Sequence, residues 1–406
     1  MSKRKKKTKW IKKRHRIVTK LAFTVLGPYT KWKYGVDVKK FKEQGDRGYL
    51  ILYNHQTAFD QFFVGMSFDG PVYYLATEDI FSIGWVSRLL QYLVAPIPIK
   101  KQATDVAAVM NCFRVAKEGG TIAIAPEGNR TYSGRTEYMN PAIISMIKKM
   151  KMPVALYRIE GGYGVQPRWS DVVRKGKMRA GVSQVIEPEE CASMTDEELY
   201  ERIRQGLAVD EGNSDGIFES DKRAEYLERA IYVCPSCGLS EFESHGNQVE
   251  CKKCHRKVEY GKDKTLTGVD FEFPFRYMTE WYDYQNDYVC GLDLMQHTEK
   301  PLFTDTANLS EVIVYKRKEP LRQAASVHLY GDRIVVDEGR EDALVLPFGE
   351  ISTATVLGKN KLNIYHGDKI YQFKSDERFN ALKYVNFYFR YKQIDKGEEG
   401  DKFLGI

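Results

Sequence analysis

The chain has 406 residues, which at roughly 100–200 residues per domain allows about two to four domains. Hydrophobic residues make up 43% and charged residues 29%, a composition that excludes a mainly disordered or collagen-like chain. No uncharged apolar run approaches the roughly 18–20 residues of a membrane-spanning helix, so an integral membrane protein is not expected. The net charge is +7, but residues 1–20 hold eleven Lys/Arg and no Asp/Glu, which leaves the remaining chain at −4.

The first 30 residues form a basic arm with a helical pattern. Apolar residues recur at three-, four- and seven-residue steps and so share one helix face, namely Trp10, Ile11, Ile17, Val18, Leu21, Ala22 and Val25. Apolar residues opposite Lys and Arg are typical of a helix that lies on an anionic membrane. The alternatives are a helix packed on the following domain and a nucleic-acid-binding tail. We expect a peripheral protein on the cytoplasmic side of a membrane, without a nucleic-acid partner.

Residues 46–212 alternate predicted strands with predicted helices. Strands are expected at 48–54, 72–76, 121–125, 153–159 and 178–186. Helices are expected at 58–68, 79–93, 103–118, 141–150 and 195–207. The alternation predicts an α/β domain with a mostly parallel sheet and flanking helices. Ligands of such sheets bind beyond the carboxyl ends of the strands, where polar clusters occur at 54–60 and 126–131.

The first polar cluster holds a candidate general base. His is the side chain best suited to take a proton near neutral pH, and a carboxylate can fix its tautomer. Four residues separate His55 from Asp60, a spacing that lets Asp60, in the first helical turn, fold back on the imidazole. No Cys is close in sequence and Ser67 lies on the helix, which favours direct activation of a substrate hydroxyl over a covalent intermediate.

The second polar cluster is Ala125–Thr131, with the sequence APEGNRT. An Arg beside a Gly turn at a strand end can hold a phosphate with a fork of donors. Glu127 is expected to orient Arg130 or to contact the acceptor. A plain surface turn with Arg130 in water is the alternative.

Together the two clusters carry a resemblance. NHQTAFD, residues 54–60, is similar to the Asn-His-x4-Asp motif of the glycerolipid acyltransferase family, which includes the 1-acylglycerol-3-phosphate acyltransferases. APEGNRT is similar to the family's Glu-Gly-Thr-Arg motif. Residues 95–101 (APIPIKK) and 153–157 (PVALY) resemble its second and fourth blocks, so the resemblance covers residues 20–210.

The resemblance implies acyl transfer from an acyl thioester to a lysophospholipid hydroxyl, with 1-acylglycerol-3-phosphate as the favoured acceptor and phosphatidic acid as the product. The donor is acyl-CoA or acyl-ACP, and no catalytic metal is implied. Catalysis is assigned to His55 and Asp60. Acceptor binding is assigned to Glu127, Gly128, Asn129, Arg130 and Lys101. The alternatives are an acyltransferase for another hydroxyl lipid and an inactive membrane-bound scaffold.

Three departures from the family pattern place the acceptor in question more than the reaction. Asn129 stands where Thr is usual, and Lys101 replaces an Arg, which keeps charge but loses the bidentate fork. Tyr157 and Arg158 occupy the place of a common second Pro. All three are expected where the acceptor headgroup is read.

Two C-x-x-C pairs predict a small zinc ribbon. Cys234 and Cys237 are separated by 13 residues from Cys251 and Cys254, and four thiolates in tetrahedral reach form a closed structural zinc site. Another metal such as iron, or disulfides, are the alternatives. Acidic and basic residues are mixed here, so a protein-contact or spacer role is expected rather than nucleic-acid binding.

The C-terminal third reads as one helix, a series of short strands and a final helix. The first helix is expected at 277–289. Strands are expected at 311–315, 326–330, 333–337, 343–347, 351–356, 361–365 and 370–373. The last helix is expected from Ser375, with its apolar residues in one stripe. This pattern resembles a pleckstrin-homology-like barrel, which implies docking of a protein partner or a lipid headgroup, or a structural role.

The sequence therefore predicts five segments. They are a membrane-surface arm (1–30), an acyltransferase domain (31–212), a zinc ribbon (228–262), an aromatic-rich linker and helix (263–298) and a pleckstrin-homology-like barrel (299–395).

Overall fold

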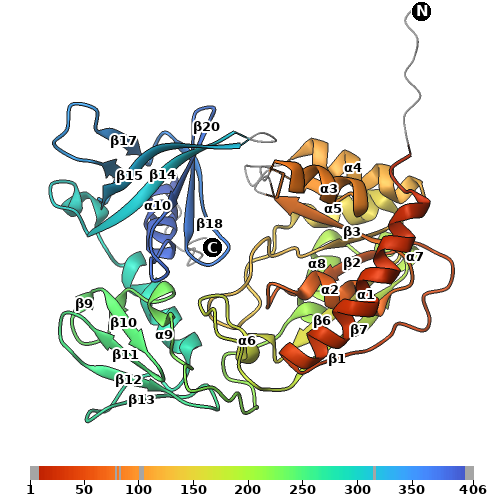
Figure 1. Cartoon of the computed structure of the whole chain (residues 1–406), viewed down its shortest axis with the longest axis horizontal. Coiled ribbons are helices and arrows are strands. Elements are labelled where there is room, and N and C mark those ends of the chain that lie inside the picture. The colour runs from red at the N-terminus through yellow and green to blue at the C-terminus, as the bar shows by residue number, and fades with distance from the viewer. Residues whose placement is uncertain (1–8, 78–79, 82–83, 100–104, 314–316, 398–406) are drawn as a thin grey trace, which may run out of the picture. The chain divides into compact units, whose positions relative to one another are not determined.

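The computed structural model describes residues 9–77, 80–81, 84–99, 105–313 and 317–397 (Figure 1). Contacts within the chain divide it into two compact units. The N-terminal unit comprises Met1–Gly128, Met139–Glu160 and Met178–Ala208. The C-terminal unit comprises Asn129–Tyr138, Gly161–Lys177 and Val209–Ile406. Two loops of the predicted acyltransferase region thus pack with the C-terminal part of the chain.

The N-terminal unit is built on one seven-stranded sheet with the order β1-β7-β6-β2-β5-β3-β4. Its strands are β1 (Val36–Val38), β2 (Leu50–Tyr53), β3 (Val72–Thr77), β4 (Ile97–Ile99), β5 (Thr121–Ile124), β6 (Val154–Glu160) and β7 (Met178–Ile186). Every neighbouring pair is parallel except β6 with β7. Every residue of β2 and β5 is buried, which explains their unbroken apolar character. The predicted mostly parallel sheet is confirmed.

Helices cover this sheet. They are α1 (Lys13–Tyr34), α2 (Asp60–Ser67), α3 (Trp85–Leu93), α4 (Val106–Lys117), α5 (Ala142–Met150), α7 (Pro188–Ser193) and α8 (Asp196–Leu207). Asp105 caps α4, and Thr195 with Glu198 forms the predicted capping box of α8. Apolar side chains of α4, α5 and α8 join those of the strands in one buried core.

The N-terminal arm differs from its prediction at both ends. Helix α1 begins at Lys13, continues through Pro28 and ends at Tyr34, where Gly35 caps it with a left-handed φ of 62°. Trp10 and Ile11 precede the helix, and their backbone N–H groups donate to the Glu118 carboxylate at 3.0 and 2.9 Å. Both side chains pack on the core of the N-terminal unit, so their expected place on an outward apolar face is wrong.

Helix α1 is also packed along its inner side. His15 is buried, and its Nδ1 lies 3.0 Å from the Tyr73 hydroxyl on β3. Burial and the neighbouring charges of Arg14 and Lys12 lower the pKa of His15. Within the described residues, no helix is long and apolar enough to cross a membrane.

The C-terminal unit begins with a small region of short strands. They are β8 (Val233–Cys234), β9 (Gly238–Leu239), β10 (Phe242–His245), β11 (Gln248–Cys251), β12 (Lys257–Tyr260) and β13 (Leu266–Gly268). Strands β10–β13 form an antiparallel sheet in chain order, and β8 pairs with β9. The predicted helix follows as α9 (Met278–Cys290). The short helix α6 (Gly162–Val165) and the 3-10 turns η2 (Leu227–Arg229) and η3 (Leu294–His297) complete this part.

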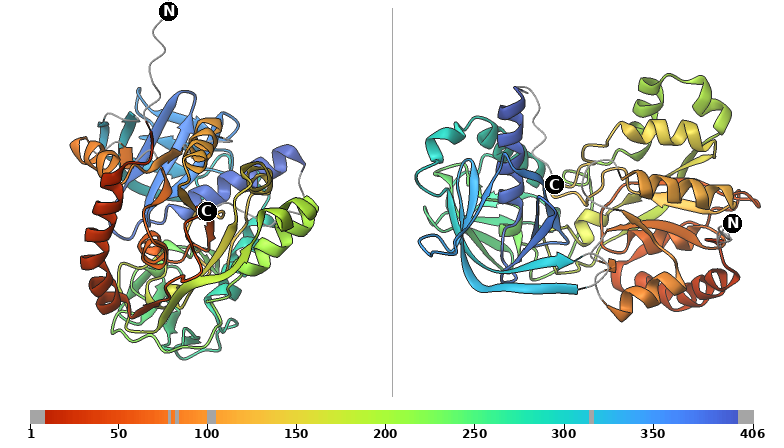
Figure 2. Two further views of the ribbon diagram at one scale, coloured as in Figure 1. Left: turned by 90° about the vertical axis from the view of Figure 1, so that its right-hand side faces the viewer. Right: turned by 90° about the horizontal axis from the view of Figure 1, so that it is seen from above.

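The rest of the unit is a curled antiparallel sheet with the order β17-β16-β15-β14-β20-β19-β18 (Figure 2). Its strands are β14 (Phe303–Ile313), β15 (Arg317–Leu329), β16 (Arg333–Val336), β17 (Leu344–Pro347), β18 (Ile351–Leu357), β19 (Lys361–His366) and β20 (Lys369–Lys374). Strands β14 and β15 are much longer than predicted. The parts that the sequence did not predict, residues 303–310 and 317–325, are mostly polar and partly exposed, so they lack the apolar alternation of a strand. The order shows an open half-barrel, so the resemblance to a pleckstrin-homology-like barrel stays an interpretation.

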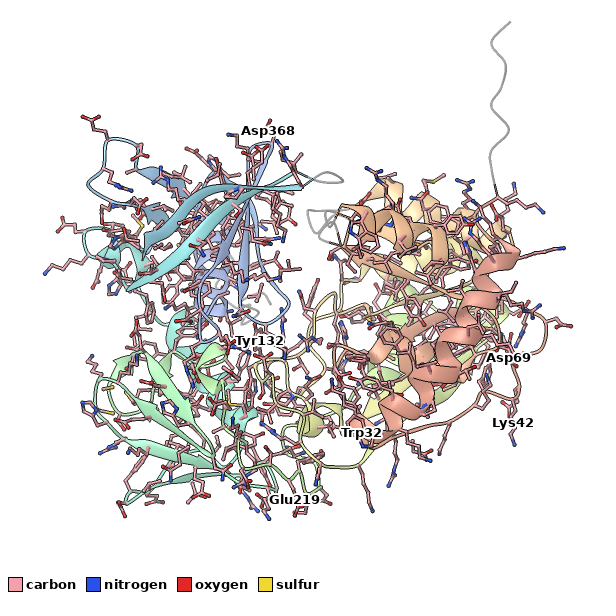
Figure 3. All side chains as sticks on the ribbon, viewed as in Figure 1. Trp32, Lys42, Asp69, Tyr132, Glu219 and Asp368 are labelled. Atoms are coloured by element: carbon pink, nitrogen blue, oxygen red, sulfur yellow. The ribbon has the colours of Figure 1, made fainter. Side chains whose placement is uncertain are left out.

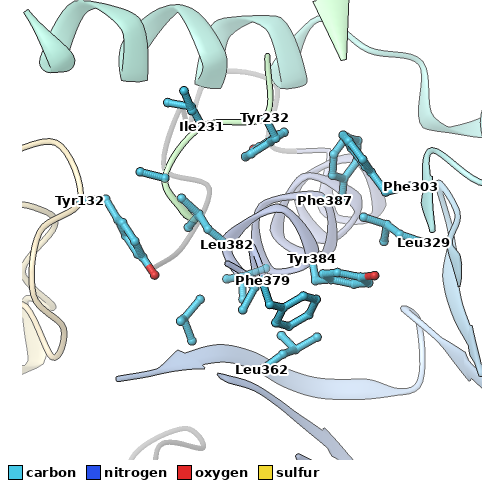
Figure 4. Close-up of a cluster of buried hydrophobic side chains, with 14 of the residues drawn as sticks. Tyr132, Ile231, Tyr232, Phe303, Leu329, Leu362, Phe379, Leu382, Tyr384 and Phe387 are labelled. Carbon is cyan, nitrogen blue, oxygen red and sulfur yellow. The ribbon is translucent and has the colours of Figure 1, made fainter. Parts of the chain in front are cut away.

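Helix α10 (Leu382–Lys396) packs against β18 and β19 and fills the core of this unit. It begins seven residues after the predicted cap, and the Ser375 hydroxyl instead donates to the carbonyl of Thr306. All seven residues 382–388 are buried, so the predicted single apolar stripe is wrong. Figure 4 shows Tyr384 and Phe387 of this helix among the buried side chains that surround it.

Candidate active site

His55 and Asp60 meet at the carboxyl end of β2. His55 is the second residue after the strand and Asp60 is the first residue of α2, so the loop between them turns the chain from strand to helix. His55 Nδ1 lies 2.7 Å from Asp60 Oδ2, the contact that the spacing predicts. An Nδ1–H donated to a carboxylate makes Nε2 the basic nitrogen of the neutral ring.

The Asp60 carboxylate is fully buried and surrounded by donors of one short loop. Oδ2 accepts the backbone N–H of Gln56 at 2.7 Å, and the N–H of Thr57 lies 2.9 Å from both oxygens. The Thr57 hydroxyl donates to Oδ1 at 2.6 Å. These bonds compensate the cost of burying the carboxylate and fix both of its oxygens. The orientation of the His55 ring is therefore set by residues within five positions of it.

Asn54 secures this loop to the sheet. Its side chain is fully buried, donates from Nδ2 to the Ile159 carbonyl at 2.8 Å and accepts the Ile159 N–H on Oδ1 at 2.8 Å. Strands β2 and β6 are adjacent and parallel, so these two bonds extend their pairing beyond Tyr53. Sequence reasoning gave Asn54 no role, although a polar residue directly after an apolar strand was the available signal.

Glu127 comes from the loop after β5, the other neighbour of β2. Because parallel strands end at the same edge, its carboxylate reaches the candidate base, and Oε1 accepts the backbone N–H of His55 at 2.9 Å. Gly128 ends a turn in which its N–H donates to the Ala125 carbonyl at 3.0 Å. Its φ of 72° is left-handed and nothing lies within 4 Å of an added Cβ, so backbone conformation is what requires glycine here. The acceptor-binding role of Glu127 and Gly128 stays a prediction.

Comparisons with known proteins found one family model and two similar proteins. Residues 36–159, which hold the His55 loop and Glu127, match the family model described as acyltransferase. The chain contains an acyltransferase domain. The chain is 20% identical over 163 residues to the 1-acyl-sn-glycerol-3-phosphate acyltransferase of Bacillus subtilis (strain 168). This match covers 40% of this chain and 78% of that protein. The crystal structure of the 1-acyl-sn-glycerophosphate (LPA) acyltransferase of Thermotoga maritima matches with a TM-score of 0.38 and 22% identity. That match covers 48% of this chain and 76% of the other.

The remaining predicted acceptor residues are Asn129, Arg130 and Lys101. Asn129 and Arg130 belong to the C-terminal unit, whose first segment starts directly after Gly128. Arg130 is buried, and its backbone carbonyl accepts a bond from Arg168 Nη1 at 2.7 Å. Lys101 lies outside the described residues.

Tyr157 does not read a headgroup, which corrects the expectation from the sequence. Its side chain is fully buried, and its hydroxyl lies 2.9 Å from both Ser67 Oγ and the Phe63 carbonyl on α2. Burial and the negative charge of Asp60 raise the pKa of Tyr157, whereas Ser67 opposes the shift. Tyr157 therefore fastens the helix that carries Asp60 to β6. The neighbouring Arg158 forms an ion pair with Glu160 at 3.0 Å.

The four cysteines of the predicted ribbon come together in the C-terminal unit. Their sulfur atoms all lie within 4.8 Å of one another, with 3.7 Å between Cys234 and Cys254 and 3.5 Å between Cys237 and Cys251. A tetrahedral zinc ion with Zn–S bonds of about 2.3 Å holds its sulfur ligands about 3.8 Å apart. The cluster therefore fits the ion that the sequence predicts, and no cysteine pair in the described ranges forms a disulfide.

Polar groups next to the cluster are directed at the sulfur atoms. The backbone N–H of Ser236 donates to Cys234 Sγ at 3.4 Å, and Ser240 Oγ lies 3.1 Å from Cys251 Sγ. Such contacts orient and stabilise thiolate ligands. Four thiolates would complete the coordination of zinc, so the cluster suits a structural ion and leaves no position for a substrate.

Proposed function

We propose that this protein is an O-acyltransferase that moves a fatty acyl group from an acyl thioester to the hydroxyl of a lysophospholipid. The favoured acceptor is 1-acylglycerol-3-phosphate, which would yield phosphatidic acid. The observation that carries the proposal is the His55–Asp60 pair at the end of β2, inside a matched acyltransferase domain. The named relatives, at low identity, support the choice of acceptor class.

The geometry supports direct attack by the acceptor. Nε2 of His55 takes the hydroxyl proton as the hydroxyl oxygen bonds to the thioester carbonyl carbon. The tetrahedral intermediate collapses with cleavage of the C–S bond, and the thiol leaves with a proton returned by the imidazolium. Asp60 stabilises the imidazolium and keeps Nδ1 protonated throughout. Glu127 contributes by holding the backbone of His55 in place.

The outer surface of α1 has the features of a membrane-binding face, which an enzyme with a membrane-bound acceptor needs. Exposed apolar side chains recur along it at helical spacing, with exposed fractions of 62% for Ile17, 65% for Leu21, 70% for Val25 and 81% for Trp32. Figure 3 labels Trp32 near the end of this helix. The helix contains six Lys/Arg and no Asp/Glu. We propose that this face lies on the cytoplasmic surface of an anionic membrane, with the protein bound peripherally.

Helix α3 adds to the exposed apolar surface of the same unit. Trp85 is 73% and Tyr92 57% exposed. Arg14 of α1 donates from Nε to the Tyr92 carbonyl at 2.7 Å and stacks 3.8 Å from the centre of its ring. The two helices are thus neighbours, and a bilayer would cover apolar residues of both.

An acyl-transfer assay tests the proposed function. Purified protein is offered acyl-CoA and acyl-ACP against 1-acylglycerol-3-phosphate, other lysophospholipids and monoacylglycerol. We expect product with the phosphate-bearing acceptor and none from His55→Ala, whose folding is checked by circular dichroism. Turnover of His55→Ala near that of the wild type would exclude the mechanism. Preference for another lipid alcohol would keep the reaction and change the acceptor.

A further inference from the structure

Helix α2, whose first residue is Asp60, is held in place by the sheet and by α1. From the sheet, the Tyr74 hydroxyl of β3 donates to the Gln61 carbonyl at 2.6 Å. The Tyr157 hydroxyl of β6 donates to the Phe63 carbonyl at 2.9 Å. The second support comes from α1, which packs against α2, and Figure 1 labels the two helices beside each other. All of these elements belong to the N-terminal unit.

The last turn of α1 packs on the residues that flank Asp60. Tyr34 is buried, and the centre of its ring lies 5.0 Å from that of Phe59 and 6.1 Å from that of Phe63. Phe59 directly precedes Asp60, and Phe63 follows it by about one turn of α2. Lys33 covers two of these rings, because its Nζ lies 5.4 Å from the centre of Tyr34 and 5.5 Å from that of Phe59. The contact with α1 therefore reaches the motif loop itself.

A second contact between the helices lies further along α2, at Gly65. An added Cβ there would overlap the ring of Phe23 on α1 and would lie 3.0 Å from the Tyr74 hydroxyl. Gly65 does not have a positive φ, so the close approach of its neighbours, and not the backbone conformation, requires glycine here. Alanine is a better helix former than glycine, so glycine at this position serves the packing of α1 on α2.

The position of α2 bears directly on the candidate catalytic pair. Asn54 fixes the first end of the motif loop to β6, and Asp60 begins the helix at the other end. A shift of α2 would carry the Asp60 carboxylate away from His55 Nδ1, which lies 2.7 Å from it. Misplacement of a catalytic group by about 1 Å can lower a rate about a hundredfold.

We propose that Tyr34 and Phe23 are positioning residues for the reaction, and that α1 holds α2 where Asp60 meets His55. The inference rests on the proposed function, because it concerns the same catalytic pair. It gives α1 two separate roles. Its outer face is the proposed membrane contact, and its inner face acts on catalysis even without a membrane. A helix that serves only as an anchor would not affect acyl transfer to an acceptor in detergent.

The first test measures initial rates of the full-length protein with acyl-CoA and 1-acylglycerol-3-phosphate in detergent micelles, well below the melting temperature of each variant. Tyr34→Ala removes the ring, and Tyr34→Phe keeps it. Tyr49→Ala is the matched control, because Tyr49 is equally buried in the same unit but lies at the opposite end of β2 from His55. We expect Tyr34→Ala to lower kcat about tenfold or more with little change in KM, while Tyr34→Phe and Tyr49→Ala keep most of the rate. Equal rates of Tyr34→Ala and Tyr49→Ala would overturn the proposal.

Gly65→Ala tests the second contact and separates positioning from stability. The added methyl group displaces Phe23, so we expect kcat to fall about tenfold or more. Phe23→Leu in the same chain shortens the overlapping side chain and should restore most of the rate. Losses of stability would accumulate in this double variant, whereas misplacement of α2 is relieved in it. Gly27→Ala on α1 is the control, because its added Cβ would meet Met66 Sδ of α2 at an ordinary 3.6 Å.

Two results of this series would overturn the role of Phe23. One is an unchanged kcat in Gly65→Ala, and the other is a double variant slower than either single variant. The series also decides the proposal if Tyr34→Ala does not fold.

Proton NMR separates this inference from the proposed function. A histidine N–H that donates to a carboxylate gives a strongly downfield resonance, and its loss in His55→Ala assigns it to the bond with Asp60. If the wild type transfers no acyl group, but the resonance is lost in Gly65→Ala and returns in the double variant, the proposed reaction fails and the positioning role stands. If the wild type is active, and Gly65→Ala and Tyr34→Ala change neither the resonance nor kcat, the reaction stands and the positioning role fails.

Discussion

Replacing Asp60 with Asn changes one atom of a buried carboxylate and tests the proposed mechanism at its most constrained point. The amide has two possible orientations. With Nδ2 at the place of Oδ2, it faces the Nδ1–H of His55 and the N–H of Gln56, which sit 2.7 Å away. The imidazole must then invert its tautomer, and Nε2 loses its basic lone pair. With Nδ2 at the place of Oδ1, it faces the N–H of Thr57 at 2.9 Å, and the imidazolium has no negative partner.

Both orientations lead to a large loss of rate. Removal of a carboxylate that orients and stabilises a catalytic imidazole lowers kcat by about 10²–10⁴-fold. Hydrogen bonds to a charged group contribute about 1.5–3 kcal/mol each, so the free energy of unfolding should also fall by a few kcal/mol. KM for the acceptor should change little, because Asp60 is fully buried.

Initial rates are measured with saturating acyl-CoA and acceptor, beside urea unfolding of the same preparations. Asp69→Asn is the matched control, since Asp69 is exposed and forms a surface ion pair with Lys40 at 2.9 Å. The double variant His55→Ala with Asp60→Asn should be no slower than His55→Ala alone, because both changes disable one unit.

The reasoning fails if folded Asp60→Asn keeps kcat within about threefold of the wild type, since a general base contributes at least about a hundredfold. It also fails if the two substitutions reduce the rate independently.

Four further outcomes are expected. Glu127→Ala should lower kcat on acceptors with and without phosphate alike, because the carboxylate holds the His55 backbone, whereas Glu127→Gln keeps an accepting oxygen and most of the rate; loss confined to phosphate-bearing acceptors would contradict this. Elemental analysis of freshly purified, reduced protein should find one zinc per chain, and Cys254→Ser should abolish it and lower the melting temperature. Trp32→Glu should weaken binding to anionic vesicles in a flotation assay. Unchanged flotation would mean that another surface than that of α1 binds the membrane. Burial raises the pKa of Glu118, but the N–H bonds from residues 10 and 11 and the charges of Arg114 and Lys9 together lower the folded-state pKa. The stabilisation is complete above the unfolded pKa of about 4.3 and is lost as pH falls through the folded value. Hydrogen exchange at residues 10–11 should therefore accelerate in acid, and Glu118→Gln should lack this acid step.

Local patterns predicted the contact between His55 and Asp60 and the cluster of four cysteines. His55 and Asp60 lie within one turn, so their spacing alone places them in contact once a strand precedes and a helix follows. Each C-x-x-C pair lies on a tight turn. The short strands between the two pairs bring the two turns together. In both cases few backbone dihedrals separate the groups, which leaves little freedom for tertiary packing to change the outcome.

Predictions failed where burial or pairing over long distances decides. In the sequence, Trp10 and Ile11 fit a helical pattern of membrane-facing residues. In the structure their backbone N–H groups donate to the Glu118 carboxylate, more than 100 residues away in the chain. Tyr157 looks like a headgroup position but is fully buried beneath α2. Residues 303–310 of β14 are mostly polar, and they form a strand because β15 supplies their backbone hydrogen-bond partners.

The sequence by itself determined the alternation of strands and helices, the contact between His55 and Asp60, and the two C-x-x-C turns, because each depends on residues close together in the chain. Only the tertiary structure decided which partners the loop residues have. Glu127 reaches the His55 backbone because β5 and β2 are parallel neighbours. Arg130 is joined to the β18–β19 turn because one buried guanidinium must satisfy its donors on carbonyls from both segments. A buried charge must be compensated by groups close to it in the folded structure, and these groups come from segments that are distant in the sequence.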